Sequence, residues 1–186
     1  MRTSAQRLNA DDKLSASEAR AFCLRMIKEF YDIDYTESWH GDLDSLLSDG
    51  SENWFSEPNR GSFYHARDAS GSVVAVGGLY DLRRKPSTQK RIGDRYDQNT
   101  QICQIVRVYL DAKFRGNGIG GEIAALLECD ALRFGYDVCY LHADAQTAST
   151  LNFWKKCGYQ DFGRFSTSSD SGTYASVDFE KYIDRQ

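Results

Sequence analysis

The feature that most constrains this chain is a glycine-rich loop set between two apolar segments. Residues 102–110 (ICQIVRVYL) predict a strand, and residues 122–127 (EIAALL) predict a helix. Four of the six residues from 116 to 121 are glycine. The first N–H groups of a helix lack intrahelical acceptors, and the helix dipole adds positive potential there. A strand, a glycine loop and a helix in this order therefore predict an anion-binding loop, to which Arg115 adds a permanent charge.

Two families of nucleotide-binding loop are compatible with these glycines. Gly116, Gly118 and Gly121 satisfy the spacing G-x-G-x-x-G, which alone suggests a dinucleotide-binding oxidoreductase. In those folds the glycines follow their strand almost at once and open a long alternating domain. Here residues 111–115 intervene, and only 65 residues follow Gly121. The dinucleotide hypothesis therefore depends on the glycine spacing alone.

The same loop resembles the acetyl-coenzyme A loop of the GNAT N-acetyltransferases. That loop has the pattern Gln/Arg-x-x-Gly-x-Gly/Ala, to which residues 115–120 (RGNGIG) correspond. Downstream, residues 138–143 predict a strand and residues 149–157 a short helix, in the order that the family keeps. The helix ends in FWKKCGY, which is similar to the family pattern Phe-Tyr-x-x-x-Gly-Phe, and Thr147 stands where the family has a turn Asn. The resemblance is specific over residues 102–165.

This resemblance implies a fold and a cosubstrate. The fold is mixed α/β, a single GNAT domain over residues 1–186, with a central, mostly antiparallel sheet, two splayed parallel strands and flanking helices. We expect the parallel pair to be the strand ending at Leu110 and the strand 138–143, because strand–helix–strand units cross over right-handedly. The implied cosubstrate is acetyl-CoA, without a metal. The residues implied to bind it are Val108, Tyr109, Leu110, Arg115, Gly116, Asn117, Gly118, Ile119, Gly120, Thr147 and Trp154.

Acetyl transfer to an amine requires a proton acceptor, since an alkylammonium has a pKa of about 10 and no lone pair. In many relatives a Glu base lies six residues before the strand-end residue, and Gln104 occupies that place here. In others the base is a Glu five residues before the turn Asn, and counting back from Thr147 leads to His142. An imidazole with an ordinary pKa of about 6.5 is a plausible base at neutral pH. A half-buried structural histidine is the equal alternative. Strand alternation predicts that Tyr140 shares its face.

The position at which GNAT relatives carry their general acid also holds a different residue in this chain. A Tyr normally stands seven residues after the turn Asn, where this chain has Trp154. An indole N–H is too weak an acid to protonate a thiolate, so Trp154 is expected to pack against the cofactor or shape the acceptor cleft. Trp39 and Trp54 lie in the segment that lines this cleft in GNAT proteins, where they form either an apolar wall or core packing.

The resemblance thus implies an acetyl-CoA-dependent N-acetyltransferase that acts by direct attack of a primary amine of a small molecule or protein. A non-catalytic, GNAT-like module that binds acyl-CoA is the alternative, motivated by Gln104 and Trp154.

Composition and charge further narrow the class of protein to which the chain can belong. A net charge of −4 offers no global basic field for a nucleic acid, and no apolar run approaches the ~20 residues that span a bilayer. Residues 1–7 lack the apolar core of a signal peptide, and the five cysteines form no C-x-x-C pair, so no metal motif is present. Cys103, Cys129 and Cys139 lie among apolar residues, which predicts reduced core thiols. We expect a cytoplasmic enzyme, monomeric or homodimeric, with no nucleic-acid or membrane partner.

The rest of the chain predicts elements in the GNAT order. These are a strand within residues 2–8, a helix over 19–30 after a capping box at 15–18, a short helix over 43–47, and hairpins over 62–80 and 159–182. Residues 81–100 are polar and charged and contain Pro86, which predicts a long loop. Its basic side chains form either a steering surface or a solvated face.

Overall fold

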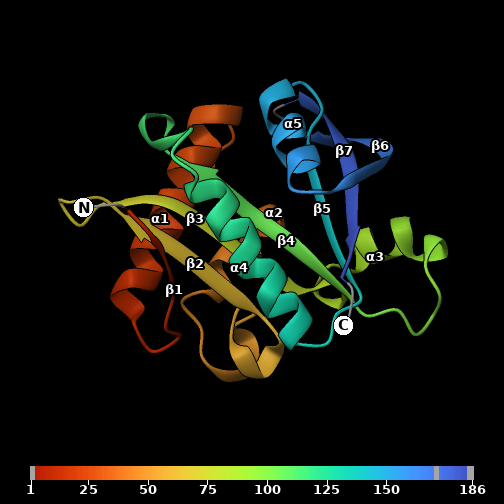
Figure 1. Ribbon diagram of the computed structural model, residues 1–186, viewed down its shortest axis with the longest axis horizontal. Coiled ribbons are helices and arrows are strands. Elements are labelled where there is room, and N and C mark those ends of the chain that lie inside the picture. Colours follow the sequence, from red (N-terminus) through yellow and green to blue (C-terminus); the bar gives the residue numbers. More distant parts are fainter. Residues whose placement is uncertain (1–2, 170–171, 184–186) are drawn as a thin grey trace.

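A seven-stranded mixed sheet carries helices on both of its faces (Figure 1). The computed structural model describes residues 3–169 and 172–183. The strands are β1 (Ala5–Arg7), β2 (Ser62–Arg67), β3 (Val73–Asp81), β4 (Ile102–Leu110), β5 (Val138–Asp144), β6 (Gln160–Ser169) and β7 (Gly172–Tyr182). Their order is β1-β2-β3-β4-β5-β7-β6, and only β4 and β5 pair in parallel. The predicted mixed, mostly antiparallel sheet is confirmed.

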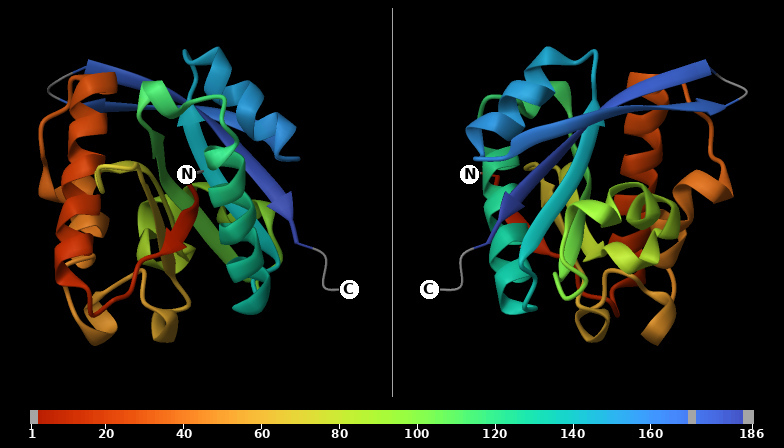
Figure 2. Two further views of the ribbon diagram at one scale, coloured as in Figure 1. Left: turned by 60° about the vertical axis from the view of Figure 1, so that its left-hand side comes forward. Right: turned by 90° about the vertical axis from the view of Figure 1, so that its right-hand side faces the viewer.

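Five α-helices among the described residues flank this sheet, two on one face and two on the other, with α3 near one end (Figure 2). They are α1 (Lys13–Tyr31), α2 (Glu37–Ser45), α3 (Pro86–Ile92), α4 (Ile119–Arg133) and α5 (Ala148–Lys156). The side chains of α1 and α2 share one apolar cluster, and those of α4 and α5 share another. No described helix is both long and apolar enough to cross a membrane.

The first helix begins earlier than the capping box predicts. Asp12 is its N-cap, and the Asp12 carboxylate accepts a hydrogen bond from the Ser15 N–H at 3.0 Å. The prediction that Ser15 caps this helix is therefore wrong, because an aspartate three residues upstream satisfies the same orphan N–H.

The parallel pair β4–β5 is short and then diverges. Three pairs hold it together, Ile102 with Val138, Cys103 with Cys139, and Gln104 with Tyr140. β4 continues to Leu110 and β5 to Asp144 without a further pair between them. The predicted splaying of two parallel neighbours at their C-terminal ends is confirmed (Figure 1).

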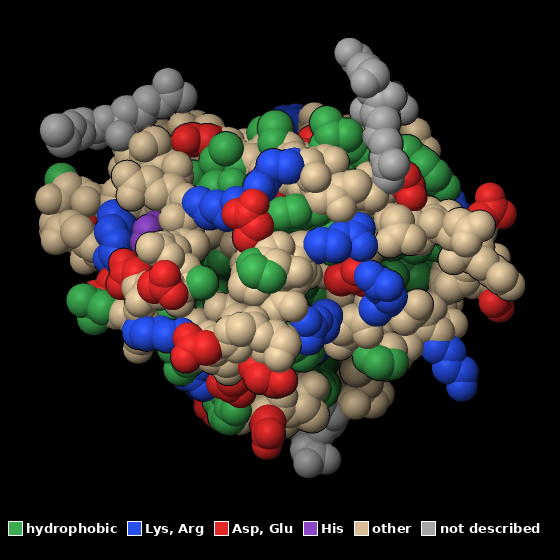
Figure 3. Space-filling view, turned by 90° about the horizontal axis from the view of Figure 1, so that it is seen from below, with side chains coloured by type: hydrophobic (Ala, Val, Ile, Leu, Met, Phe, Trp, Pro, Cys, Tyr) green, Lys and Arg blue, Asp and Glu red, His purple; other side chains and the backbone are tan. Residues whose placement is uncertain are grey.

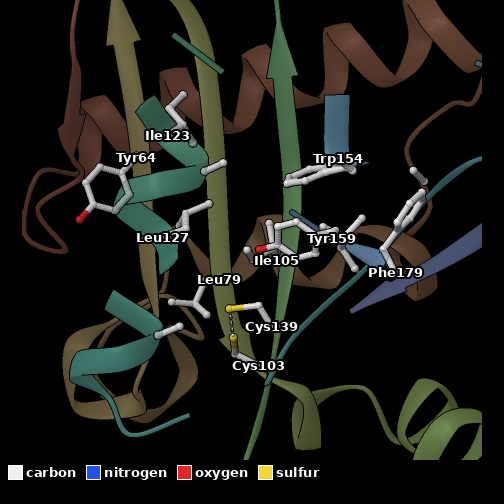
Figure 4. Packing of buried hydrophobic residues seen from close by; sticks show 14 of the residues in the cluster. Tyr64, Leu79, Cys103, Ile105, Ile123, Leu127, Cys139, Trp154, Tyr159 and Phe179 are labelled. Atoms are coloured by element: carbon white, nitrogen blue, oxygen red, sulfur yellow. Dashed lines mark hydrogen bonds between the residues drawn. The ribbon is translucent and has the colours of Figure 1, made fainter. Parts of the chain in front are cut away.

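The main apolar core lies between the sheet and helices α4 and α5 (Figure 4). Trp154 and Tyr159 pack there, with ring centroids 5.2 Å apart. Cys103 and Cys139 face each other at its base, with sulfur atoms 3.4 Å apart, and both are buried as predicted. Cys129 is exposed, so its assignment to the core is wrong. It lies on the outer side of α4, where apolar neighbours in sequence are not neighbours on the helix face.

Residues 81–100 form structure rather than the predicted long loop. Helix α3 lies between two 3-10 turns, Leu82–Arg84 and Gly93–Arg95, and Pro86 opens it with a preset φ. Arg91 and Arg95 bind carboxylates of β7, which anchors the segment to the sheet. Three of the six basic side chains of this segment, Arg83, Arg91 and Arg95, form ion pairs with carboxylates. On the face that Figure 3 shows, basic and acidic side chains are interspersed.

Candidate active site

A cavity of 620 Å³ opens where β4 and β5 diverge. Residues 104–109 of β4 and 141–144 of β5 form part of its wall. The rest comes from the end of α1, the start of α2, the segment around α3, α5, and the β6–β7 hairpin. Trp39 of α2 and Tyr174 of β7 meet edge to face, with ring centroids 6.0 Å apart. Elements from both halves of the chain therefore enclose one site.

A β-bulge shapes the β4 side of this cavity. Two residues, Arg107 and Val108, oppose Gly77 alone, and Arg107 has a left-handed φ of 56°. A Cβ on Gly77 would lie 2.5 Å from a side-chain carbon of Ile123, so helix α4 packs too closely there for a side chain. The bulge interrupts the regular alternation of β4 just beyond the last residue that pairs with β5.

Arg107 enters a buried ion pair with Asp42 of α2. Its guanidinium donates to both carboxylate oxygens, at 2.9 and 2.7 Å, and to the Trp39 carbonyl at 2.8 Å. Burial alone would raise the pKa of Asp42, but the Arg107 charge and hydrogen bonds hold that pKa below its ordinary value. Both charges are therefore present at neutral pH, and the pair joins α2 to the bulged strand.

His142 projects from β5 into the cavity and belongs to a polar network. Tyr140 lies on the same face, as predicted, and its hydroxyl is 3.4 Å from His142 Nδ1. That hydroxyl donates to Asp178 at 2.6 Å and accepts from Arg91 at 2.7 Å. Because the Tyr140 proton is directed at Asp178, Nδ1 is assigned as the protonated nitrogen, which leaves the lone pair on Nε2.

The imidazole of His142 is held in its neutral form. It is exposed to the cavity, but the protein around the cavity desolvates it, and the charges of Arg91, Arg107 and Lys85 oppose a further positive charge. These effects outweigh the attraction of Asp178 and lower the pKa of His142 to about 4. The expectation of an ordinary imidazole pKa near 6.5 is therefore wrong.

Gln104 lies at the point where the two strands part. Its side chain is 3% exposed and lines the cavity. Its Oε1 atom has no hydrogen-bond partner among the described residues. A buried oxygen without a donor is unfavourable, typically by about 1–3 kcal/mol, so the hydrogen-bonding capacity of this atom is unused among the described residues.

The glycine loop lies beyond the end of β4. Gly116 and Gly118 both have left-handed φ, 80° and 85°, and Gly118 is the N-cap of α4. No side chain caps this helix, so the N–H groups of its first turn are available to an anion. Arg115 is exposed, and its guanidinium lies over the Phe30 ring, 4.8 Å from the centroid.

The predicted cofactor residues fall into two groups. Val108, Tyr109 and Trp154 line the cavity. The others lie outside its wall, namely Leu110, Arg115, Gly116, Asn117, Gly118, Ile119, Gly120 and Thr147. The Thr147 hydroxyl donates to Asp144 at 2.5 Å, which ties it to the rim of the cavity.

Charged residues of the wall are absent from the predicted site. The sequence does not single out Asp42 or Arg107, and it marks Lys85 and Arg91 only as parts of a basic loop. No local motif marks them, because each acquires its neighbours through tertiary contacts. One indirect signal was present, namely the acidic residues Asp178 and Glu180 within a predicted strand. Both are buried in the fold, and buried carboxylates need cationic partners from elsewhere in the chain.

Within residues 3–169 and 172–183, no group of three or more His, Cys, Asp or Glu side chains comes together as metal ligands do.

The sheet, the diverging parallel strands and the uncapped glycine loop together define a class of protein. The chain matches the sequence model described as the Acetyltransferase (GNAT) family over residues 24–159, and it belongs to that family. It is therefore an acyltransferase, and the dinucleotide-binding hypothesis is dismissed. No curated protein sequence matches the chain significantly.

Solved structures share this fold at low sequence identity. Arabidopsis thaliana NAA60 in complex with acetyl-CoA is 13% identical, with a TM-score of 0.70 over 97% of this chain and 98% of that one. A GNAT-family acetyltransferase from Staphylococcus aureus Mu50 is 15% identical, with a TM-score of 0.68 over 98% and 99%. Ard1 from Thermoplasma volcanium is 14% identical, with a TM-score of 0.61 over the whole of both chains (100% each). At these identities the likeness concerns the fold alone.

Proposed function

We propose that this acetyltransferase moves the acetyl group of acetyl-CoA directly onto a primary amine of a small molecule or protein, and that residues 1–186 form one such domain. The observation that carries the proposal is the divergence of β4 and β5 beyond Gln104. It leaves backbone N–H and C=O groups on one edge of β4 without a neighbouring strand, beside a cavity. A pantetheine arm, which is itself amide-bearing, can use these groups as a strand would.

The start of α4 suits the pyrophosphate of the coenzyme. Left-handed glycines and an uncapped first turn offer N–H groups to an anion over residues 115–120, and Arg115 adds charge-assisted hydrogen bonds. The acetyl and pantetheine parts would then lie along Val108, Tyr109 and Leu110, toward the cavity. The acetyl-CoA complex of NAA60 supports the assignment of this cosubstrate.

His142 is the proposed base. The amine reaches the site neutral, having lost its first proton to solvent, since an imidazole with a pKa of about 4 cannot deprotonate an alkylammonium efficiently. As the amine nitrogen bonds to the acetyl carbon, that nitrogen becomes strongly acidic, and His142 Nε2 takes one of its protons directly or through one water. The C–S bond breaks, and the sulfur leaves with the bonding electrons.

The proton held by His142 can then pass to the departing thiolate or to solvent. Trp154 is not the acid, because an indole N–H is too weakly acidic to protonate a thiolate. Its ring packs against Phe153 and Tyr159 instead, with centroids 4.9 and 5.2 Å away. We also propose that Gln104 Oε1, a buried oxygen without a described partner on a cavity-lining residue, accepts a hydrogen bond from the amine and so holds its lone pair toward the acetyl carbon.

Thermal unfolding followed by a turnover assay tests the proposal. Acetyl-CoA should raise the melting temperature, whereas NAD should not, since a ligand that binds only the native state stabilises it. Coenzyme A release should then depend on an added amine, in a panel of small amines and peptides, and should be lost in His142→Ala. Binding of acetyl-CoA without release of the thiol for any acceptor would favour the non-catalytic module.

A further inference from the structure

Lys85 is a cation on the cavity wall that lacks a carboxylate partner. It precedes α3, and its ammonium lies 5.4 Å from the centroid of the Trp54 ring. Lys85 takes part in none of the ion pairs, with nitrogen and oxygen within 4.0 Å, that the described residues form. Burial lowers the pKa of Lys85, with Asp42 opposing and Arg107 adding to the effect. A partly desolvated ammonium without a carboxylate in direct contact is unfavourable, so an anion beside it would be stabilising.

The other cations of the wall are already neutralised. Arg107 donates two hydrogen bonds to the Asp42 carboxylate. Arg91 binds both oxygens of the Asp178 carboxylate. Among the Lys and Arg side chains of the cavity wall, Lys85 is therefore the one that no described carboxylate contacts directly.

One more carboxylate lines the cavity, at its other end. Asp144 closes β5 and accepts hydrogen bonds from the Thr147 hydroxyl and the Gln146 N–H, at 2.5 and 3.2 Å. These bonds belong to the turn before α5, and no ion pair joins Asp144 to Lys85 among the described residues.

Lys85 shares its cavity with the two groups that face the amine in the proposed function. Gln104 presents an unpartnered buried oxygen, which requires a donor. His142 is kept neutral, and the Lys85 charge is one of the causes. A ligand that satisfies all three carries an N–H donor and an anionic oxygen. A plain amine reacts in its neutral form and brings no negative charge, so it would leave the Lys85 ammonium without a counter-ion in a partly desolvated site.

We propose, on the basis of that function, that the acceptor is a small amine that also bears a carboxylate, and that Lys85 binds this carboxylate. The ammonium donates charge-assisted hydrogen bonds to it while the amine nitrogen lies between Gln104 and His142. Lys85 then determines which amines are acetylated, without taking part in proton transfer.

Matched pairs of acceptors that differ by one carboxylate test the inference. Suitable pairs are glycine with methylamine, leucine with isopentylamine, phenylalanine with phenethylamine, and γ-aminobutyrate with propylamine. The wild-type kcat/KM should be higher for the carboxylate-bearing member of at least one pair. Lys85→Met should reduce that ratio by roughly 10- to 100-fold, the usual range for a hydrogen bond to a charged group. Lys85→Arg should retain most of it.

Lys90→Met is the matched control, since Lys90 lies on α3, the helix that Lys85 precedes, is exposed and does not line the cavity. It should leave the ratio unchanged. A ratio near one in the wild type, or a ratio that Lys85→Met leaves intact, overturns the inference while amine acetylation itself stands. No thiol release with any pair, while a peptide acceptor does release the thiol, overturns this inference alone. No thiol release with any small amine or peptide, in a protein that binds acetyl-CoA, overturns the proposed function as well.

Discussion

At the start of α4, the residues proposed to meet the coenzyme follow one another in the chain, from Arg115 to Gly120. On the part of the cavity wall that we propose to meet the acceptor, which we call the acceptor side, Asp42, Lys85 and His142 come from three separate parts of the chain. The first region works through backbone geometry, left-handed glycines and an uncapped helix. The second works through side-chain charges that balance or oppose one another across the fold.

This difference determines how each region responds to substitution. A backbone site fails when a residue cannot adopt the required φ, and the damage stays local. A charged wall fails when a partner is removed, because the remaining charge is left buried and the fold itself is weakened. Four substitutions should therefore affect four separate quantities: turnover, stability, coenzyme affinity and acceptor recognition.

The largest effect is expected for His142→Ala. Loss of a general base typically lowers the rate by about 100- to 10,000-fold, and we expect kcat to fall within this range. Acetyl-CoA affinity, measured by calorimetry, should change little, because His142 lies on the acceptor side of the gap. Near-normal turnover in this variant would show that His142 is a structural residue and that solvent removes the proton.

The pH profile provides an independent check on the same residue. A group with a pKa of about 4 is already neutral throughout the range from pH 6 to 8, so His142 should contribute no bend there. The rate should instead rise with pH as the acceptor amine, with a pKa of about 10, loses its proton. A bend near pH 6.5 that disappears in His142→Ala would contradict the lowered pKa.

Asp42→Asn should have the largest effect on stability. It leaves the buried Arg107 charge without its counter-ion, which typically lowers the free energy of unfolding by about 3–5 kcal/mol. Asp49→Asn is the control, since Asp49 pairs with Lys13 but is 85% exposed, and exposed pairs contribute about 0–1 kcal/mol. Denaturant unfolding measures both. Equal losses in the free energy of unfolding would contradict the expectation that the buried pair contributes more than the exposed pair.

Gly118→Val should weaken acetyl-CoA binding by at least roughly 100-fold. A β-branched residue is strained at a φ of 85°, and its side chain would stand where the pyrophosphate approaches the backbone. The same substitution at Gly93, which has a φ of −62° and open space around it, should leave affinity unchanged. Titration calorimetry measures both variants. Unchanged affinity in Gly118→Val would remove the basis for the coenzyme assignment.

The smallest effect is expected for Gln104→Leu. It should lower kcat/KM for the amine about tenfold, which corresponds to the loss of one hydrogen bond. The free energy of unfolding should stay equal or rise by about 1 kcal/mol, because an unpaired buried oxygen is removed. Ser62→Ala removes another buried oxygen that has no described partner but lies away from the cavity, and it should leave kcat/KM unchanged. A loss of stability in Gln104→Leu would imply a structural role.

Much of the architecture follows from local pattern. Alternation over residues 102–110, the glycine loop and the apolar helix after it are contiguous, and each expresses a backbone preference that neighbours in sequence can satisfy. The parallel pairing and its divergence follow from chain connectivity, since a right-handed crossover leaves few arrangements. The glycine loop was predictable for the same reason, because the groups that we propose to bind the anion are backbone N–H groups.

The arrangement of charged residues on the acceptor side of the cavity depends on tertiary structure. Residues 81–100 have no apolar periodicity, and α3 is held by Arg91 and Arg95, whose carboxylate partners lie more than 80 residues away on β7. The pKa of His142 depends on charges from β4, α3 and β7, none of which the sequence around it contains. Backbone geometry is specified by adjacent residues, whereas the energy of a charge depends on everything packed around it, and only the folded chain brings those groups together.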